Sequence, residues 1–381
     1  MSRRVSFLFL LVCGSFCFSG ETPAGPSVAL VPFIETGSVA GAVTLVADKE
    51  KVLSLEAIGY SDVKSKTPIK TDAVFWIASM SKPITGVGLM MLVDEGKVKL
   101  DDPVEKYLPE FKDMWVAVEK DKDHMLLKRP KSAITVRQLM DHTSGMPFRS
   151  AMEEPTLDRL TLRDAIKSYV MTPLQTEPGT KYAYSNAGIN SAGRIIEVVS
   201  KMPYEQFMDK RVFEPLGMKD TTFWPNASQV ARLAHAYKPA ADKLHLEETN
   251  IAQLTYPLSN RTRQPMPAGG LFSTAEDVGT LCRMVLNVGT KGNVRFLSED
   301  AIKEMSKRST PPELKESYGI GWSVSDGWFG HGGALATDMQ INTKQGLILV
   351  YLVQHAGFPN DGSKGKAAFQ QAAIAKFGKP R

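Results

Sequence analysis

Ser79 and Lys82 stand three residues apart in the segment Ser79-Met80-Ser81-Lys82. At helical spacing, residues i and i+3 share a face, so the hydroxyl and the amine can come within hydrogen-bonding reach. A serine hydroxyl is a weak nucleophile until a neighbouring base accepts its proton. A lysine can be that base when burial or nearby positive potential lowers its pKa. The spacing is thus compatible with nucleophilic attack by Ser79, although it also arises by chance from a capping serine and a surface lysine.

The residues around this motif favour a nucleophilic Ser79 over a chance spacing of a capping serine and a surface lysine. Residues 84–93 (Ile-Thr-Gly-Val-Gly-Leu-Met-Met-Leu-Val) are apolar on nearly every side, and a helix without a polar face is a buried one. Gly96 is placed to end this helix, and a strand-like segment at 73–78 precedes Ser79. Burial and the positive end of the helix dipole would both lower the pKa of Lys82.

Two other segments carry groups that suit the same reaction. Tyr184 and Asn186 occur in Tyr184-Ser-Asn186. A tyrosine beside a cation can take the serine proton and later protonate the leaving group, and the asparagine is placed to orient the lysine and a substrate carbonyl. His331-Gly332-Gly333 lies between two strand-like segments, where glycines let a substrate approach a strand edge closely. Each segment is unremarkable when taken alone.

The elements that must position these residues follow from the pattern of apolar residues. Strands are expected at 42–47, 52–59, 318–324, 336–342 and 347–355, and helices at 136–142, 162–170, 188–200, 204–212, 273–287 and 365–377. A capping box is expected at the start of the 273–287 helix, with Ser273 as the cap and Glu276 three residues later.

Strands at both ends of the chain and helices between them predict an α/β (α+β) fold. One antiparallel sheet would be formed by the N- and C-terminal segments and flanked by helices. We expect a sheet domain made of residues 21–100 and 265–381, and a mostly helical inserted domain at 101–264.

Residues 1–20 have the pattern of an export signal. Arg3 and Arg4 precede an apolar run from Val5 to Phe18, and small residues follow it. This pattern predicts a cleaved signal peptide and a secreted or periplasmic protein. The alternative is an uncleaved membrane anchor, for which the apolar run is short.

Removal of this signal would leave Cys282 as the only cysteine, so the mature chain would contain no internal disulfide. Its helical surroundings predict a packing role. The loss of Arg3 and Arg4 takes the net charge from +5 to +3. Charges of both signs are interspersed, also in the lysine-rich stretch 120–131, which we expect to be a solvated loop. The composition indicates neither a nucleic-acid partner nor a cofactor, and it leaves the oligomeric state open.

Several segments in a fixed order match a known family. They are Phe75-Trp-Ile-Ala-Ser-Met-Ser-Lys-Pro83, Leu139-Met-Asp-His-Thr-Ser-Gly-Met-Pro147, Pro178-Gly-Thr-Lys-Tyr-Ala-Tyr-Ser-Asn186, Phe213-Glu-Pro-Leu-Gly-Met-Lys-Asp-Thr221, Pro267-Ala-Gly-Gly-Leu-Phe-Ser-Thr-Ala-Glu-Asp277 and Gly330-His-Gly-Gly333. From about 33 to 377 the chain resembles the serine β-lactamase-like superfamily, in its class C-like branch with family VIII-type carboxylesterases and DD-peptidase-like proteins.

The resemblance implies a role for each site residue. Ser79 would be the nucleophile, Lys82 and Tyr184 the general base and acid pair, and Asn186 a substrate-orienting residue. The backbone amides of Ser79 and Ala334 would form the oxyanion hole.

His331-Gly332-Gly333 occupies the place of the family's Lys-Thr-Gly motif, and here the chain departs from it. The family lysine meets the carboxylate of the substrate, whereas a histidine is largely neutral near pH 7. We therefore predict a carboxylesterase acting on short acyl esters. The alternatives are a β-lactamase or D-Ala-D-Ala carboxypeptidase, with a β-lactam or peptidoglycan peptide as substrate, and a non-catalytic binding protein of the same fold.

Other candidate residues are less well supported. Glu154-Pro-Thr-Leu-Asp158 resembles the deacylating segment of class A β-lactamases but precedes Tyr184, so we interpret it as a surface loop. His142 is expected to be a structural hydrogen-bonding residue. His235 and His355 lack the partner spacing of a metal site, and the chain has no Gly-x-Ser-x-Gly nucleophile elbow.

Overall fold

A seven-stranded antiparallel sheet organises the structure, a computed structural model that describes residues 24–379. The predicted signal at residues 1–20 lies outside this range. The strand order is β12-β13-β14-β15-β1-β2-β3, so the two ends of the chain meet where β15 pairs with β1. The strands are β1 (Gly41–Ala47), β2 (Val52–Asp62), β3 (Thr67–Pro68), β12 (Ser323–Ser325), β13 (Trp328–Gly332), β14 (Asp338–Asn342) and β15 (Leu347–Leu352).

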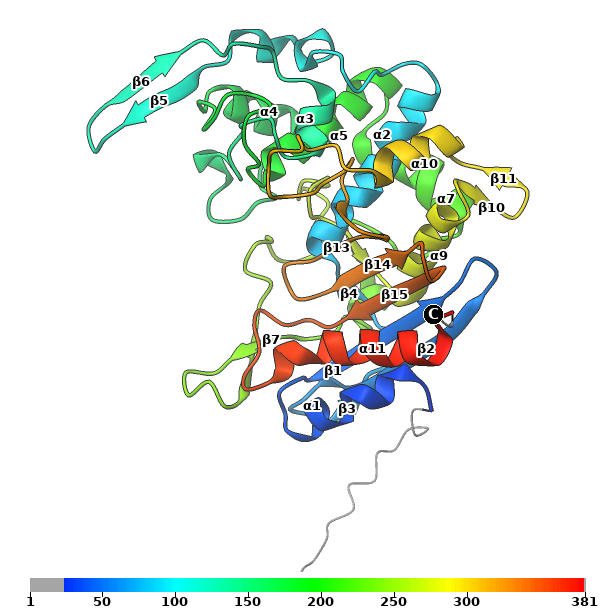
Figure 1. The fold of residues 1–381 in the computed structure, drawn as a ribbon. Helices are drawn as coiled ribbons and strands as arrows, with labels where there is room; N and C mark the ends of the chain where they lie inside the picture. The colour runs from blue at the N-terminus through cyan, green and yellow to red at the C-terminus, as the bar shows by residue number, and fades with distance from the viewer. Residues whose placement is uncertain (1–23, 380–381) are drawn as a thin grey trace, which may run out of the picture.

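The central strands are almost entirely apolar because helices cover both faces of the sheet. All residues of β1 and β15 are buried. On one face, Ala42 and Val46 join the apolar cluster that includes Phe369 of α11 (Gly365–Phe377). On the other face, Val43 and Leu45 belong to the main core with α9 (Ala275–Leu286). Figure 1 shows α11 lying along the sheet. This arrangement confirms the predicted fold class.

The predicted all-apolar helix is α2 (Ser81–Asp94), and its residues from Ser81 to Leu92 are all buried. It packs mainly against α5 (Asn186–Ser200), with further contacts to helices on its other sides. The remaining helices are α1 (Val31–Glu35), α3 (Val136–Met140), α4 (Leu162–Val170), α6 (Tyr204–Met208), α7 (Glu214–Leu216), α8 (Ala227–Val230) and α10 (Glu299–Ser306). No helix within residues 24–379 is long and apolar enough to cross a bilayer.

Several sequence predictions are corrected. His331 and Gly332 lie within β13 and not between strands, and the expected strand at 318–324 is reduced to β12, which begins at Ser323. Thr274, not Ser273, caps α9, because its side chain accepts a hydrogen bond from the Asp277 amide.

Short hairpins that the sequence pattern did not predict interrupt the helical region and the chain after α9. They are formed by β5 (Val116–Lys120) with β6 (Met125–Lys128), β7 (Ala236–Pro239) with β8 (Leu246–Thr249), and β10 (Thr290–Lys291) with β11 (Val294–Arg295). The lysine-rich stretch expected to be a loop is exposed, but it contains the turn and second strand of the first of these hairpins. β4 (Phe75–Trp76) pairs with β9 (Phe272–Ser273) just before the Ser79 turn.

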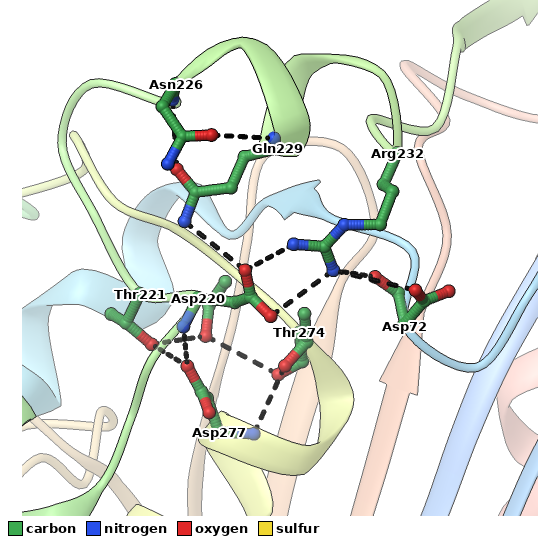
Figure 2. Close-up of polar contacts among 9 residues, drawn as sticks. Asp72, Asp220, Thr221, Asn226, Gln229, Arg232, Thr274 and Asp277 are labelled. Carbon is green, nitrogen blue, oxygen red and sulfur yellow. Dashed lines mark hydrogen bonds and ion pairs between the residues drawn. The ribbon is translucent and has the colours of Figure 1, made fainter.

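A polar cluster joins three distant parts of the chain near α9 (Figure 2). Arg232 forms an ion pair with Asp220 and donates to the backbone carbonyl of Asp72. Asp277 of α9 accepts from the Asp220 amide at 2.8 Å and from the Thr221 hydroxyl at 2.9 Å. These bonds explain why the Met-Lys-Asp-Thr221 turn is polar although it is packed against the core.

A second polar contact within the core is the ion pair of Asp158 and Arg263. Their side chains are 0% and 1% exposed. The guanidinium Nε lies 2.7 Å from the carboxylate, which also accepts from Thr255. Arg263 in turn donates to the Phe223 carbonyl. The pair therefore fixes the long connection that precedes Pro267.

Arg263→Met should lower the free energy of unfolding by about 3–5 kcal/mol, because it leaves the Asp158 charge buried without a cation. Urea denaturation of both proteins measures the difference. Lys344→Met is the matched control, since it removes an ion pair with Asp326 whose side chains are 60% and 89% exposed; such pairs contribute little. Equal losses of unfolding free energy in the two variants would contradict the stabilising role of the buried Asp158–Arg263 pair.

Candidate active site

Ser79 lies in a single 3₁₀ turn, Ala78–Met80, between β4 and the first residue of α2. Ala78 directly before it has a φ of +46°. This left-handed conformation costs a residue with a Cβ on the order of 1–3 kcal/mol and clusters at functional sites. The Ser81 hydroxyl donates to the Ala78 carbonyl at 2.6 Å and holds the turn in place. The side chain of Ser79 is only partly buried, so it remains accessible to a substrate.

Lys82 is fully buried, and its amine has three oxygen neighbours. Nζ lies 3.0 Å from Ser79 Oγ, 2.8 Å from Asn186 Oδ1 and 2.7 Å from the Ala268 carbonyl. Burial lowers the pKa of Lys82 well below its usual value, because desolvation disfavours the charged form. The predicted proximity of Ser79, Lys82 and Asn186 is therefore present in the structure.

Tyr184 lies just before α5 and faces the same amine. Its ring centroid is 4.6 Å from Lys82 Nζ. Burial raises the pKa of Tyr184, and a side-chain hydrogen bond with Ser79 opposes that shift. The segment is held by Ser185, whose hydroxyl accepts from the Gly188 amide and donates to the Pro147 carbonyl. This cap sets the positions of Tyr184 before the helix and Asn186 at its first turn.

His331 is buried in β13, and both of its ring nitrogens have partners. Nδ1 lies 2.6 Å from the Gly332 carbonyl and Nε2 lies 2.7 Å from the Tyr318 hydroxyl. Since a carbonyl only accepts, Nδ1 carries the proton and Nε2 accepts from Tyr318. Burial lowers the pKa of His331 to about 3, and the Lys82 charge adds to this effect. The imidazole is thus neutral and has no free N–H for a substrate.

The two glycines after His331 differ in their surroundings. A Cβ on Gly333 would lie 2.5 Å from the Ile77 carbonyl and 2.1 Å from Thr337 Oγ1, whereas one on Gly332 would meet nothing closer than 3.5 Å. There is thus open space beside Gly332 but none beside Gly333, and the role of both glycines in substrate approach stays a prediction. Gly333 instead lets the strand pack against the segment that leads to Ser79.

Ala334 lies in the turn that follows β13 and is exposed. Among residues 24–379, its amide donates to no other protein atom at hydrogen-bonding distance. The amide is therefore available to a ligand, as the predicted oxyanion role requires.

Two residues that contact the site, Tyr318 and Ala268, were not assigned a role from the sequence, and a third, His142, was expected to be a structural hydrogen-bonding residue. Tyr318 is buried and binds His331, and Ala268 accepts from Lys82. His142 is buried with its ring 4.4 Å from that of Tyr184. The Ser185 amide donates to His142 Nδ1, so the proton is on Nε2, for which the described residues offer no acceptor. The sequence signal that could have drawn attention to Tyr318 and Ala268 is the glycines that follow them, Gly319 and Gly321 in one case and Gly269 and Gly270 in the other.

The candidate residues that the sequence supported less well have structural partners outside the site. Glu154 is exposed and pairs with Arg149, but Asp158 is buried in the ion pair with Arg263, so it does not lie on a surface loop as expected. His235 pairs with Glu248, and His355 accepts from the Ala40 amide. Cys282 is buried, and burial raises the pKa of its thiol to about 12, in line with the expected packing role.

Comparisons with known proteins identify the family and the fold of the chain. The family model described as Beta-lactamase matches residues 29–373. Protein Rv1367c of Mycobacterium tuberculosis is 32% identical over 367 residues, which cover 87% of this chain and 90% of that protein. The comparison thus extends over nearly the whole described chain.

Two solved structures share the fold at low sequence identity. Unliganded simvastatin synthase (LovD) of Aspergillus terreus has a TM-score of 0.79 at 20% identity, covering 94% of this chain and 100% of that one. EstCE1, a hydrolase with promiscuous acyltransferase activity, has a TM-score of 0.76 at 23% identity, covering 91% and 97%. With the family model matching most of its length, the chain belongs to the beta-lactamase family of serine hydrolases.

Proposed function

We propose that the protein is a carboxylesterase that hydrolyses neutral acyl esters through a covalent acyl-enzyme at Ser79. The observation that carries this proposal is the set of acceptors around Lys82. A neutral amine has two N–H bonds and one lone pair, and the Asn186 side-chain oxygen and the Ala268 carbonyl can only accept. These two oxygens take both N–H bonds. The lone pair is then left to face the Ser79 hydroxyl, 3.0 Å away.

In the acylation step, Lys82 takes the Ser79 proton as Oγ bonds to the acyl carbon. Tyr184, which faces both groups, passes a proton to the departing alkoxide as the C–O bond breaks, and it recovers one from Lys82. A water molecule then attacks the acyl-enzyme with the same groups as base and acid. The products are a carboxylic acid and an alcohol, and Ser79 is restored.

The backbone amides of Ser79 and Ala334 are the proposed donors to the oxyanion. Their separation depends on Gly333, because this residue allows the chain after β13 to lie against Ile77, two residues before Ser79. Backbone donors that are already in place stabilise the negative charge that develops in the transition state, because they need no rearrangement during the reaction.

The neutral state of His331 favours the proposal that the substrate carries no carboxylate. The family lysine at this position would meet a carboxylate, whereas the His331 imidazole is neutral and both of its nitrogens are engaged. Removing a carboxylate from water without a cationic partner is costly. The relative EstCE1, described as a hydrolase, is compatible with ester chemistry. Membership of the beta-lactamase family keeps β-lactam or D-Ala-D-Ala cleavage as the second candidate.

We also propose that the protein is exported. Arg3, Arg4 and the apolar run that follows them support this proposal. Fractionation of cells that express the full chain, with the N-terminal residue of the protein determined, tests both export and cleavage.

Ser79→Ala should abolish release of p-nitrophenol from p-nitrophenyl butyrate and labelling by a fluorophosphonate probe, because both need the hydroxyl. Steady-state kinetics and the intact mass of the labelled protein are the measurements. Circular dichroism of the variant controls for folding. Retained turnover in Ser79→Ala would refute the mechanism, and a wild-type chain that neither turns over nor labels would favour a non-catalytic binding protein.

kcat/KM for the same ester should rise with pH through the lowered pKa of Lys82, because only the neutral amine can accept the serine proton. A pH–rate profile between about pH 4 and 9 covers this range. His331, with a pKa of about 3, should contribute no step there. The His331→Gln variant is the control, and its acid limb should keep the same midpoint. If the limb disappears in that variant, the titrating group is His331.

A neutral ester should be preferred over one that ends in a carboxylate. We expect kcat/KM for p-nitrophenyl pentanoate to exceed that for p-nitrophenyl succinate by about tenfold or more, which corresponds to roughly 1.4 kcal/mol in the transition state. His331→Lys restores a cation at this position and should narrow the ratio. Faster turnover of nitrocefin or of the succinate ester by the native protein would favour the second candidate.

A further inference from the structure

The Ala268 carbonyl belongs to a loop whose successive carbonyls are all bound by buried side chains. Thr85 of α2 donates to the Pro267 carbonyl at 2.8 Å, Lys82 to that of Ala268 at 2.7 Å, and Trp76 to that of Gly269 at 2.7 Å. The position of the loop therefore decides where one of the two lysine N–H bonds points.

Asn190 holds this loop from the opposite side. It lies one helical turn after Asn186 on α5, is 0% exposed, and accepts from the Ala268 amide at 3.0 Å through Oδ1. Helix α5 thus controls both acceptors of the lysine. Asn186 binds the amine directly, and Asn190 binds the peptide unit whose carbonyl binds it.

The orientation of the Asn190 amide is fixed by two further buried groups. Nδ2 donates to the Tyr169 hydroxyl at 2.9 Å, and that hydroxyl lies 2.5 Å from Glu153 Oε1. An ionised carboxylate only accepts, so Tyr169 donates to Glu153 and offers its lone pair to Nδ2. The Asn190 oxygen must then face Ala268. A flipped amide would set two N–H groups against each other at this point.

We propose that Asn190 is a positioning residue that aims the lone pair of Lys82 at Ser79 by holding the peptide unit of Ala268, with Tyr169 and Glu153 fixing its orientation. This inference rests on the proposed function, since it concerns the same general base. Asn190 does not contact the nucleophile in the structure; it acts through Ala268.

The charged and titratable groups around Lys82 come from several elements. Tyr184 precedes α5, His142 follows α3, and His331 lies on β13. The pKa values of both histidines are lowered, first by burial and then by Lys82. Neither histidine is charged near neutral pH, so a change in the acid limb of the rate profile reports on the lysine.

The test is Asn190→Leu, which keeps the branched shape but leaves the Ala268 amide without an acceptor. We expect kcat on p-nitrophenyl butyrate to fall roughly tenfold to a hundredfold, since a displacement near 1 Å at a reacting group can cost that much. KM should change little. A displaced Ala268 carbonyl stabilises the charged form of Lys82 less, so the pKa of Lys82 should fall. The acid limb of kcat/KM should therefore move to lower pH.

The matched control is Ser191→Ala, the next residue on α5. Its hydroxyl is equally buried but donates to the Ala187 carbonyl within the helix. Thermal melting should show a loss of stability in both variants, whereas only Asn190→Leu should change kcat and the acid limb. Equal kinetics in Asn190→Leu and the native protein would overturn the positioning role.

Asn190→Asp keeps an oxygen toward Ala268 and serves if the leucine variant does not fold. Its plateau kcat should stay closer to native, because a protonated aspartic acid can accept from the Ala268 amide and donate to the Tyr169 hydroxyl as Asn190 does. A loss of kcat in this variant as large as the loss expected for Asn190→Leu would refute the proposal. Ser79→Ala separates the two claims: if Ser79→Ala is inactive while the Asn190 variants behave as native, only the positioning role fails.

Discussion

The burial of one amine constrains the whole site. Lys82 lies in a helix that is buried from Ser81 to Leu92, so its charged form is disfavoured by desolvation. A neutral amine in such a position still needs partners for its N–H bonds, because unpaired buried polar groups are costly. The structure supplies two oxygens that only accept, and the remaining lone pair faces Ser79. The same contacts that make burial tolerable would also prepare Lys82 for its proposed role as base.

The sheet supplies the second half of the site from the other end of the chain. β13 approaches the Ser79 turn closely enough that only glycine fits at Gly333. The strained backbone of Ala78 and this close approach together define the gap in which an oxyanion would lie. Because the central strands are buried on both faces, this geometry rests on packed layers and not on a mobile loop.

Around the amine, the protein keeps its histidines neutral. His142 and His331 are both buried, and each has its proton placed by a backbone partner. A second cation beside Lys82 would raise the cost of any positive charge there. The neutral imidazole of His331 adds no such cation, so burial accounts for the lowered pKa of Lys82, and His331 offers no charge to pair with a carboxylate.

The fold class could be predicted from the sequence because period-two and all-apolar patterns report burial directly, and 42–47 and 162–170 correspond closely to β1 and α4. Ser79, Lys82 and Tyr184 could be named from spacing and from the ordered family segments. His331 was misplaced between strands, since glycines weaken the strand signal on which such predictions rest. Asn190 and Tyr169 could not be found, because their partners lie from 16 to 78 residues away in sequence. Residue types and local spacing thus determined what chemistry is available, and only tertiary packing decided which oxygen faces which proton.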